Sequence, residues 1–269
     1  MTAEPRFTAI VLAAQRDGRL DPLAAEAGVS HKCLVPIGGR PLLAHVLEAL
    51  ASRSDIRAVR ISVEEGAQDR LRAVAGASGE LGVPVTFVPA EATITDSVYV
   101  AAGDDEGPFV VTTADNVLLT AEAVRRMTDR LRAGDDAVVA LSRKEDVLSA
   151  HPQGQRRFYR FTDGSYSNCN LYGLSRRGLA LAETFRSGGQ FAKNPMRIAV
   201  AFGLFNLLLL RYGLISLDRA MFRVGRRFGV KASAVVLEDG AHAIDVDNAR
   251  TYSIAAELLQ RRIAASPGA

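Results

Sequence analysis

Residues Ala9–Leu43 read AIVLAAQRDGRLDPLAAEAGVSHKCLVPIGGRPLL, and this stretch decides the fold of the chain. It opens with an apolar, β-branched run, which predicts a buried strand, and the strand ends in two small residues, Ala13 and Ala14. A polar loop with arginines and a glycine follows, then Lys32, and then a Gly-Gly turn before a helix. Small residues let a backbone approach a triphosphate, and cations neutralise it, so the stretch predicts a phosphate-binding loop. An ordinary polar loop between a strand and a helix is the alternative.

Strand-like and helix-like segments alternate along the first half of the chain. Apolar runs predict strands at Thr8–Leu12, Ala58–Val63, Val83–Val88, Phe109–Thr113 and Ala137–Leu141. Helical spacing predicts helices at Pro41–Ala51, Glu65–Val74 and Thr120–Leu131. This order predicts a three-layer α/β/α, Rossmann-like fold with a mostly parallel sheet. Ligands of such sheets bind beyond the carboxyl ends of the strands, so the loops there are the places to look for chemistry.

The second half is less regular. Strands are expected at Arg157–Phe161, Asn170–Ser175 and Val230–Leu237, and helices at Arg177–Phe185 and Asn248–Ile263. We interpret residues 187–229 as a helical, basic insertion or lid within a single domain of residues 1–269. Its apolar run Ile198–Leu210 is shorter than the roughly 20 residues that cross a bilayer. That run should therefore pack against the catalytic domain, against a second subunit in a homodimer, or against a lipid-like acceptor.

Composition narrows the class of protein. The 269 residues are 48% hydrophobic and 23% charged, which is typical of a globular domain. The formal net charge of only +3 suits an anionic small molecule and argues against nucleic acid as a partner. Cys33 and Cys169 belong to no metal or disulfide motif, and Met1–Arg6 has no signal-peptide character, so a cytoplasmic location is expected.

Three segments of the first stretch resemble a known signature. They are Leu12–Ala14, Lys32-Cys-Leu-Val-Pro36 and Gly38-Gly-Arg-Pro-Leu-Leu43, and they are similar to the LAAGxGxR, KxLxP and GG/KxPLL segments of the MobA-like NTP transferases, which are nucleotidyltransferases of GT-A type fold. The chain departs from that signature at Gln15, where the family usually has glycine.

The resemblance implies roles for the residues of this stretch. Lys32, with Arg16 or Arg19, would offset phosphate charge during catalysis, and His31 is an additional phosphate candidate. The implied nucleotide contacts are Leu12, Ala13, Ala14, Gln15, Gly18 and Lys32.

The resemblance also implies metal-binding aspartates, for Mg²⁺ or Mn²⁺. The strand Phe109–Thr113 delivers Asp115 to its carboxyl end, where a carboxylate can bind a hard cation, although Asp115 could instead cap a turn. Late in the chain, Asp247 matches the second metal ligand of the family, and Asp245 is its near substitute. At positions i and i+2 of an extended segment both carboxylates point the same way. Helix capping by Asp247 is the alternative.

Other candidates are less specific. Asp96 and Ser97 lie where relatives contact the base or ribose, but a helix N-cap at Thr95 or Asp96 explains the same pattern. Asn168 and Asn170 resemble an acceptor-binding strand. The acceptor could also meet cations near the predicted insertion, at Lys193, Arg197, Arg226 and Arg227, although such a group is more often a solvated face.

These features together predict a metal-dependent nucleotidyltransferase. It would transfer NMP from an NTP, with CTP and GTP as first candidates, to a phosphorylated small molecule and release pyrophosphate. A nucleotide-sugar glycosyltransferase of the same fold is one alternative. A non-catalytic nucleotide-binding relative is another, because of Gln15 and the altered residues that follow Asp247.

Overall fold

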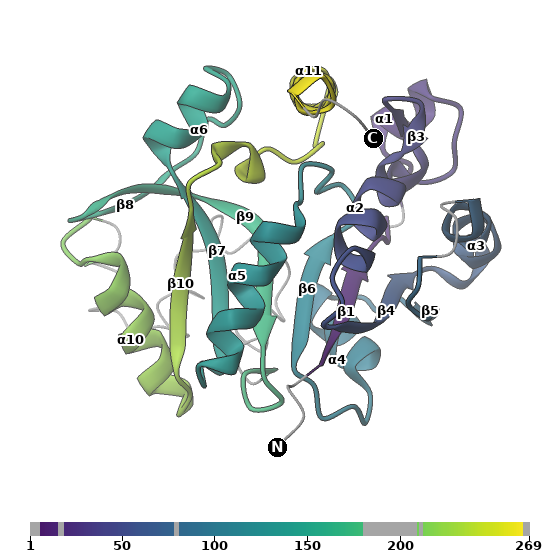
Figure 1. Ribbon diagram of the computed structural model, residues 1–269. Helices are drawn as coiled ribbons and strands as arrows, with labels where there is room; N and C mark the ends of the chain where they lie inside the picture. Colours follow the sequence, from purple (N-terminus) through teal and green to yellow (C-terminus); the bar gives the residue numbers. More distant parts are fainter. Residues whose placement is uncertain (1–5, 16–18, 78–80, 180–208, 210–211, 266–269) are drawn as a thin grey trace.

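The computed structural model describes residues 6–15, 19–77, 81–179, 209 and 212–265. Its main sheet has the strand order β10-β7-β9-β6-β1-β4-β5, with β8 paired to β9 (Figure 1). The strands are β1 Phe7–Leu12, β4 Ile56–Val63, β5 Val85–Pro89, β6 Phe109–Thr113, β7 Ala137–Arg143, β8 Tyr159–Phe161, β9 Gly164–Leu174 and β10 Ala232–Leu237. β9 runs antiparallel to β6, β7 and β8, and all other neighbours are parallel. The predicted three-layer fold with a mostly parallel sheet is confirmed.

Helices cover both faces of this sheet. They are α1 Pro22–Glu26, α2 Leu42–Ala51, α3 Gln68–Ala77, α4 Ile94–Ala102, α5 Ala121–Arg132, α6 Lys144–Ala150, α10 Leu217–Phe228 and α11 Ala249–Ala265, with 3-10 turns η2 Lys32–Leu34, η3 Glu65–Ala67 and η6 Gly240–Ala243. Side chains alternate between the faces of a strand, so Ala9 and Val11 of β1 pack with α2, α3 and α5, whereas Ile10 packs with α4 and α10. The core therefore consists of two apolar layers with the sheet between them.

The order of the strands brings several carboxyl ends to one edge. β1 lies between β4 and β6, parallel to both, and its residues Phe7–Val11 are fully buried. At its carboxyl end, the amide of Ala114 donates to the carbonyl of Leu12 over 2.9 Å. The loops that follow β1, β4 and β6 therefore share this edge, where ligands of such sheets bind.

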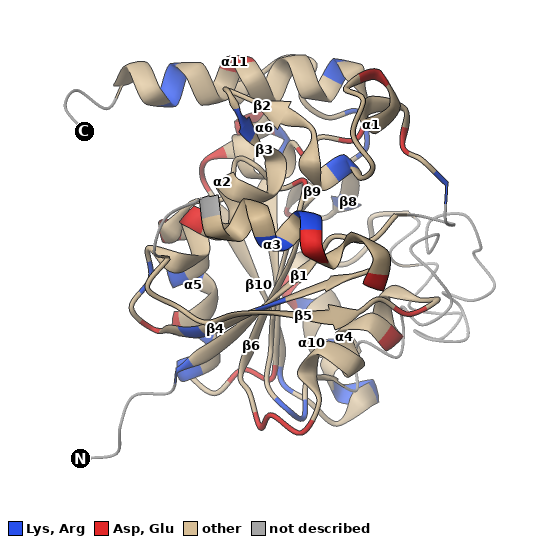
Figure 2. Ribbon diagram, turned by 90° about the vertical axis from the view of Figure 1, so that its right-hand side faces the viewer, with Lys and Arg blue, Asp and Glu red and all other residues tan. Residues whose placement is uncertain are grey.

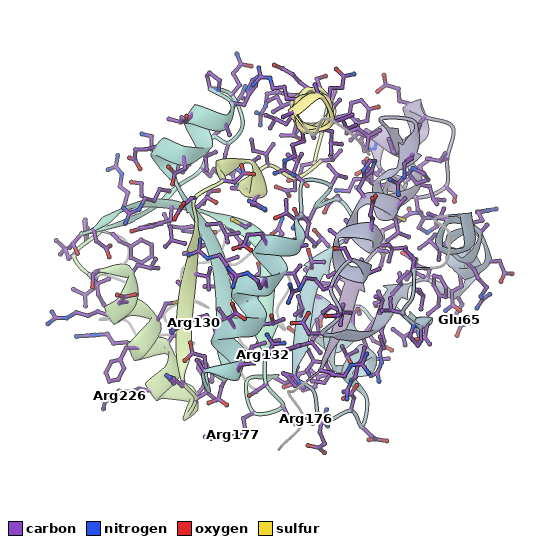
Figure 3. The ribbon with its side chains drawn as sticks, viewed as in Figure 1. Glu65, Arg130, Arg132, Arg176, Arg177 and Arg226 are labelled. Atoms are coloured by element: carbon purple, nitrogen blue, oxygen red, sulfur yellow. The ribbon has the colours of Figure 1, made fainter. Side chains whose placement is uncertain are left out.

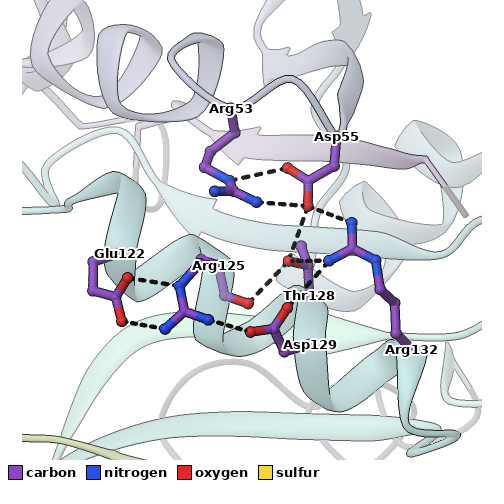
Figure 4. A network of polar contacts seen from close by, with 7 residues as sticks. All are labelled: Arg53, Asp55, Glu122, Arg125, Thr128, Asp129 and Arg132. Carbon is purple, nitrogen blue, oxygen red and sulfur yellow. Dashed lines mark hydrogen bonds and ion pairs between the residues drawn. The ribbon is translucent and has the colours of Figure 1, made fainter. Parts of the chain in front are cut away.

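A polar network ties the scaffold together on the α2 and α5 side (Figure 4). Asp55, which precedes β4, accepts hydrogen bonds from Arg53, from Arg132 at 2.6 Å and from Thr128 at 3.1 Å. Burial alone would raise the pKa of Asp55, but the hydrogen bonds and charges of Arg53 and Arg132 hold it below its ordinary value. Because Asp55 lies at the amino end of β4, this network is structural and remote from the ligand-binding edge.

Several element boundaries differ from the sequence predictions. β9 is one continuous strand of 11 residues, not only the short strand expected at Asn170–Ser175, and β5 starts two residues later than Val83. The short helices α1 and α6 were missed, because five and seven residues carry little periodicity. The helix expected at Arg177–Phe185 and the apolar run Ile198–Leu210 fall almost wholly outside the described residues.

The described end of the predicted insertion is part of the regular fold. α10 lies directly before β10, and its residues Val224 and Phe228 pack in the same apolar layer as α4. Over the described ribbon, acidic and basic positions are interspersed (Figure 2). In the described ranges, no helix has the length and apolar character needed to cross a membrane.

Candidate active site

Three carboxylates meet at the ligand-binding edge. Asp115 follows β6, and Asp245 and Asp247 lie between η6 and α11; one carboxylate oxygen from each lies within 4.8 Å of the others. The backbone amide of Val246 donates to the carbonyl of Asp115 over 3.2 Å and holds the two segments together. The structure thus brings together residues that are about 130 positions apart in the sequence.

Lys32 lies against this cluster. Its ammonium contacts Oδ2 of Asp115 and lies 3.4 Å from Oδ1 of Asp247. Burial alone would lower the pKa of Lys32, but the charge and hydrogen bond of Asp115 and the charge of Asp247 outweigh it and raise the pKa above its ordinary value. Lys32 therefore stays positively charged beside the aspartates.

One lysine does not satisfy three carboxylates. Asp115 is only 8% exposed, and its Oδ1 atom is buried without a hydrogen-bond partner. Burial and the neighbouring charges of Asp115 and Asp247 raise the pKa of Asp245 well above its ordinary range. An all-oxygen donor set with an unpaired buried oxygen suits a hard divalent cation, so the residues present fit Mg²⁺ or Mn²⁺.

Asp247 does not cap a helix. The side chain of Asn248 accepts from the amide of Thr251 over 3.2 Å, and the hydroxyl of Thr251 accepts from the amides of Asn248 and Asp247. This reciprocal cap begins α11. The alternative in which Asp247 is the helix cap is therefore wrong, and its carboxylate remains exposed beside Lys32.

The described phosphate-loop candidates begin at the carboxyl end of β1, at the same edge of the sheet as the cluster. Leu12 ends β1, Ala13 is buried with its amide bonded to the carbonyl of Ser62, and Ala14 is exposed. Arg19 is exposed, while Arg16 and Gly18 lie outside the described residues.

Gln15 belongs to a closed ring of contacts. Its backbone amide donates to Oε1 of Glu64 over 2.7 Å, and its side-chain amide donates to the carbonyl of Ser30 over 2.6 Å. His31 completes the ring, with Nε2 3.3 Å from Oε2 of Glu64 and Nδ1 3.0 Å from the Ser30 hydroxyl. The residue that departs from the family signature thus links the end of β1 to the segment that carries Lys32.

The start of α4 lies at the same edge, because α4 follows β5 and β5 is parallel to β4. Thr93 is the N-cap, and not Thr95 or Asp96 as the sequence suggested: its hydroxyl accepts from the amide of Asp96 over 3.1 Å. The Thr93 hydroxyl also donates to the Asp96 carboxylate, and the hydroxyl of buried Ser97 accepts from the amide of Glu91. In this state Asp96 and Ser97 stabilise their own helix start.

The predicted acceptor residues do not lie together in the structure. Asn170 on β9 reaches the acidic cluster, where its side-chain amide donates to Oδ2 of Asp245 over 2.9 Å, whereas the side chain of Asn168 contacts Asn170 and Tyr172. Lys193 and Arg197 lie outside the described residues. Arg226 and Arg227 occupy the last turn of α10, before the amino end of β10, so they are remote from the cluster; Figure 3 shows Arg226 low on the molecule.

Comparison with known proteins assigns this architecture to a family. A family model described as the MobA-like NTP transferase domain matches residues 9–194, which is more than half of the chain. The chain belongs to this family. Its fold is of the GT-A type.

Individual relatives are more distant. The bifunctional protein GlmU of Rhizorhabdus wittichii is 33% identical over 155 residues, which cover 55% of this chain and 31% of that protein. The chain thus spans about a third of the length of the GlmU proteins that it matches. A hypothetical transferase from Thermus thermophilus aligns with a TM-score of 0.74 at 29% identity, over 92% of this chain and 99% of that one. The 4-diphosphocytidyl-2C-methyl-D-erythritol synthase of Anaerococcus prevotii shares the fold at a TM-score of 0.59 and 14% identity, over 96% and 97% of the two chains.

Sequence reasoning missed several residues that build the site of this MobA-like domain. Glu64 directly follows the strand β4, so a search for polar residues at strand ends could have found it. Thr251 was not among the candidates, although it forms the cap that begins α11. Asn116 was not a candidate either, but its side-chain amide donates to the hydroxyl of Thr112 and to the carbonyl of Cys169. That role depends on the pairing of β6 with β9, which no local pattern shows.

Proposed function

We propose that this chain transfers a nucleotidyl group from an NTP, CTP or GTP, to a phosphorylated small-molecule acceptor in a reaction that requires Mg²⁺. In this reaction an acceptor phosphate oxygen forms a bond to the α-phosphorus. The bond from the α-phosphorus to the oxygen that bridges it to the β-phosphate breaks, and pyrophosphate leaves with that electron pair. The acceptor phosphate is an anion near neutral pH, so no strong general base is needed.

One observation carries the proposal. The Lys32 ammonium and the unpaired Asp115 oxygen lie together at the edge where β1 ends and the phosphate-loop candidates begin. A positively charged side chain next to a carboxylate that can bind a metal suits a polyphosphate that arrives with a divalent cation. A sugar or other neutral ligand needs neither feature.

The residues of the chain then have separate tasks. Asp115, Asp245 and Asp247 would hold the metal, which supplies positive charge next to the phosphates when bound. Lys32 is placed to meet charge that builds on the phosphate oxygens, and Arg16 and Arg19 belong to the same loop. The Gln15 ring keeps the ends of that loop together. Positioning and charge neutralisation provide the catalysis.

A pyrophosphate-release screen tests the proposal. The four NTPs are combined with a panel of sugar, polyol and other small-molecule phosphates in the presence of Mg²⁺, with Asp115→Asn as the inactive control. Pyrophosphate release that depends on both substrates, with a matching nucleotidyl product, is the expected result. Release of a nucleoside diphosphate from a nucleotide sugar would instead identify a glycosyltransferase, and tight NTP binding with no turnover across the panel would identify a non-catalytic relative.

A further inference from the structure

β9 is irregular at the point where it passes the acidic cluster. Val139 of β7 pairs with Tyr172, but Leu141 pairs with Asn168, so two steps along β7 face four along β9. Asn170 lies in this irregularity with φ of 47°, and it is the one non-glycine residue with positive φ in the ranges that the structure describes. Asparagine tolerates this left-handed conformation better than most residues, and bulges of this kind redirect side chains near active sites.

Side chains from β6 and from the residues that follow it donate hydrogen bonds to the backbone of the bulge. The hydroxyl of Thr112 on β6 donates to the carbonyl of Asn170 over 2.9 Å. The side-chain amide of Asn116, next to Asp115, donates to the carbonyl of Cys169 over 3.0 Å. Both irregular carbonyls are therefore satisfied by side chains from the Asp115 segment, which stabilises a backbone conformation that would otherwise be costly.

The bulge directs a chain of hydrogen bonds to Asp245. Nδ2 of Asn170 donates to Oδ2 of Asp245 over 2.9 Å. Oδ1 of Asn170 accepts from Nδ2 of Asn168 over 3.0 Å, and the same Nδ2 donates to the phenolic oxygen of partly buried Tyr172 over 2.6 Å. Because Asn168 holds the other end of the Asn170 amide, that amide fixes the orientation of the Asp245 carboxylate.

We infer that Asn170 is a positioning residue for Asp245, which makes Asp245 a third metal-binding carboxylate and not a substitute for Asp247. The inference rests on the metal site of the proposed function. Asn170 thereby acts on the metal side of the site, and not through the acceptor contact that the sequence predicted. Tyr172 and Asn168 support it through their hydrogen bonds.

The test measures metal affinity directly. Mn²⁺ binding to the full chain is followed by electron paramagnetic resonance for the wild type, Asn170→Gly and Tyr172→Phe. Glycine keeps the left-handed backbone and removes only the side chain, so the fold should persist, and thermal melting checks this. We expect Asn170→Gly to weaken Mn²⁺ binding about tenfold or more. Tyr172→Phe, which keeps the ring and removes one hydroxyl at the far end of the chain, should weaken it by less.

A parallel Asp115→Asn titration separates the two ideas. If Asp115→Asn abolishes Mn²⁺ binding and Asn170→Gly binds as the wild type does, the positioning role is wrong and the metal site stands. If Asp115→Asn also binds Mn²⁺ normally, the metal site itself fails. Unchanged Mn²⁺ affinity in Asn170→Gly together with a raised KM for the acceptor would overturn the inference and return Asn170 to the acceptor.

Discussion

The ammonium of Lys32 contacts the carboxylate of Asp115 although 83 positions separate the two residues in the sequence. Lys32 lies in the turn η2, and Asp115 follows β6, so the pairing exists only because β1 and β6 are neighbours in the sheet. It brings the lysine of the KxLxP segment and the aspartate that follows β6 to one point, as the proposed function requires.

Asp115→Asn should abolish turnover and leave the fold intact. The change removes one carboxylate charge and almost no volume, while the buried position is kept. Steady-state pyrophosphate release and thermal melting measure the two effects. Activity within a few-fold of the wild type would show that Asp115 is not a metal ligand in the reaction.

Lys32→Ala should lower kcat by roughly 10²- to 10³-fold, or about 3–4 kcal/mol, as expected for one charge-assisted contact to the transition state. Mn²⁺ affinity should not fall, because the ammonium competes with a cation for Asp115 and Asp247. Lys144→Ala, on α6 and outside the cluster, is the control. An effect confined to KM would place Lys32 in ground-state binding instead.

Glu64→Ala should raise the KM for the NTP about tenfold, since the loss of a charge-assisted hydrogen bond to the loop backbone costs roughly 1–3 kcal/mol. The variant frees the Gln15 amide and breaks the contact with His31. Glu64→Gln keeps an acceptor for that amide and should have a smaller effect. Glu65→Ala, one position along and exposed, is the matched control. If Glu64→Ala binds NTP more tightly than the wild type, the carboxylate repels the triphosphate and does not support its loop.

Both thiols should be unreactive in the folded protein. Burial raises the pKa of Cys33 and of Cys169 to about 12, so at pH 8 only about one thiol in ten thousand is the reactive thiolate. A thiol-specific chromogenic disulfide should therefore label neither cysteine until denaturant is added. Rapid labelling of either residue without denaturant would contradict the packing of that part of the core.

His242 should make the protein less stable in mild acid. Burial lowers its pKa, against the opposing effect of Asp239, and its ring lies 2.9 Å from the Thr120 hydroxyl that caps α5. The unfolded chain binds a proton near pH 6.5, whereas the folded chain does not until lower pH. The contribution is therefore complete above about pH 6.5 and is lost as the pH falls, with a slope of at most about 1.4 kcal/mol per pH unit.

Urea unfolding between pH 5 and 8 measures this slope. His242→Gln should flatten it relative to the wild type, and the remaining slope includes His45, whose pKa is also lowered by burial. Parallel pH profiles for the variant and the wild type would show that His242 titrates alike in the folded and unfolded states.

The sequence by itself determined the layered fold and the principal candidates. The apolar runs of β1, β4 and β6 are local signals, because a fully buried parallel strand must be apolar on both faces. The small residues after β1, Lys32 in its KxLxP segment and Asp115 at a strand end follow from the same stretches, so their proximity could be expected from the rule for parallel sheets. The hairpin turn before α2 was equally local, since Gly38 and Gly39 both adopt positive φ.

Only the tertiary structure decided how the rest of the site is built. The Gln15 ring needs β1 and β4 side by side, the Asn170 bulge needs β6 and β7 on either side of β9, and the freedom of Asp247 depends on the cap made by Asn248 and Thr251. The first two arise from contacts between residues far apart in the chain. The third was a choice between two adjacent polar residues, Asp247 and Asn248, each able to cap a helix. Local patterns determine which segments are strands and helices, but the direction of a side chain is set by whichever neighbour can satisfy its hydrogen bonds, and that neighbour is known only when the strands are paired.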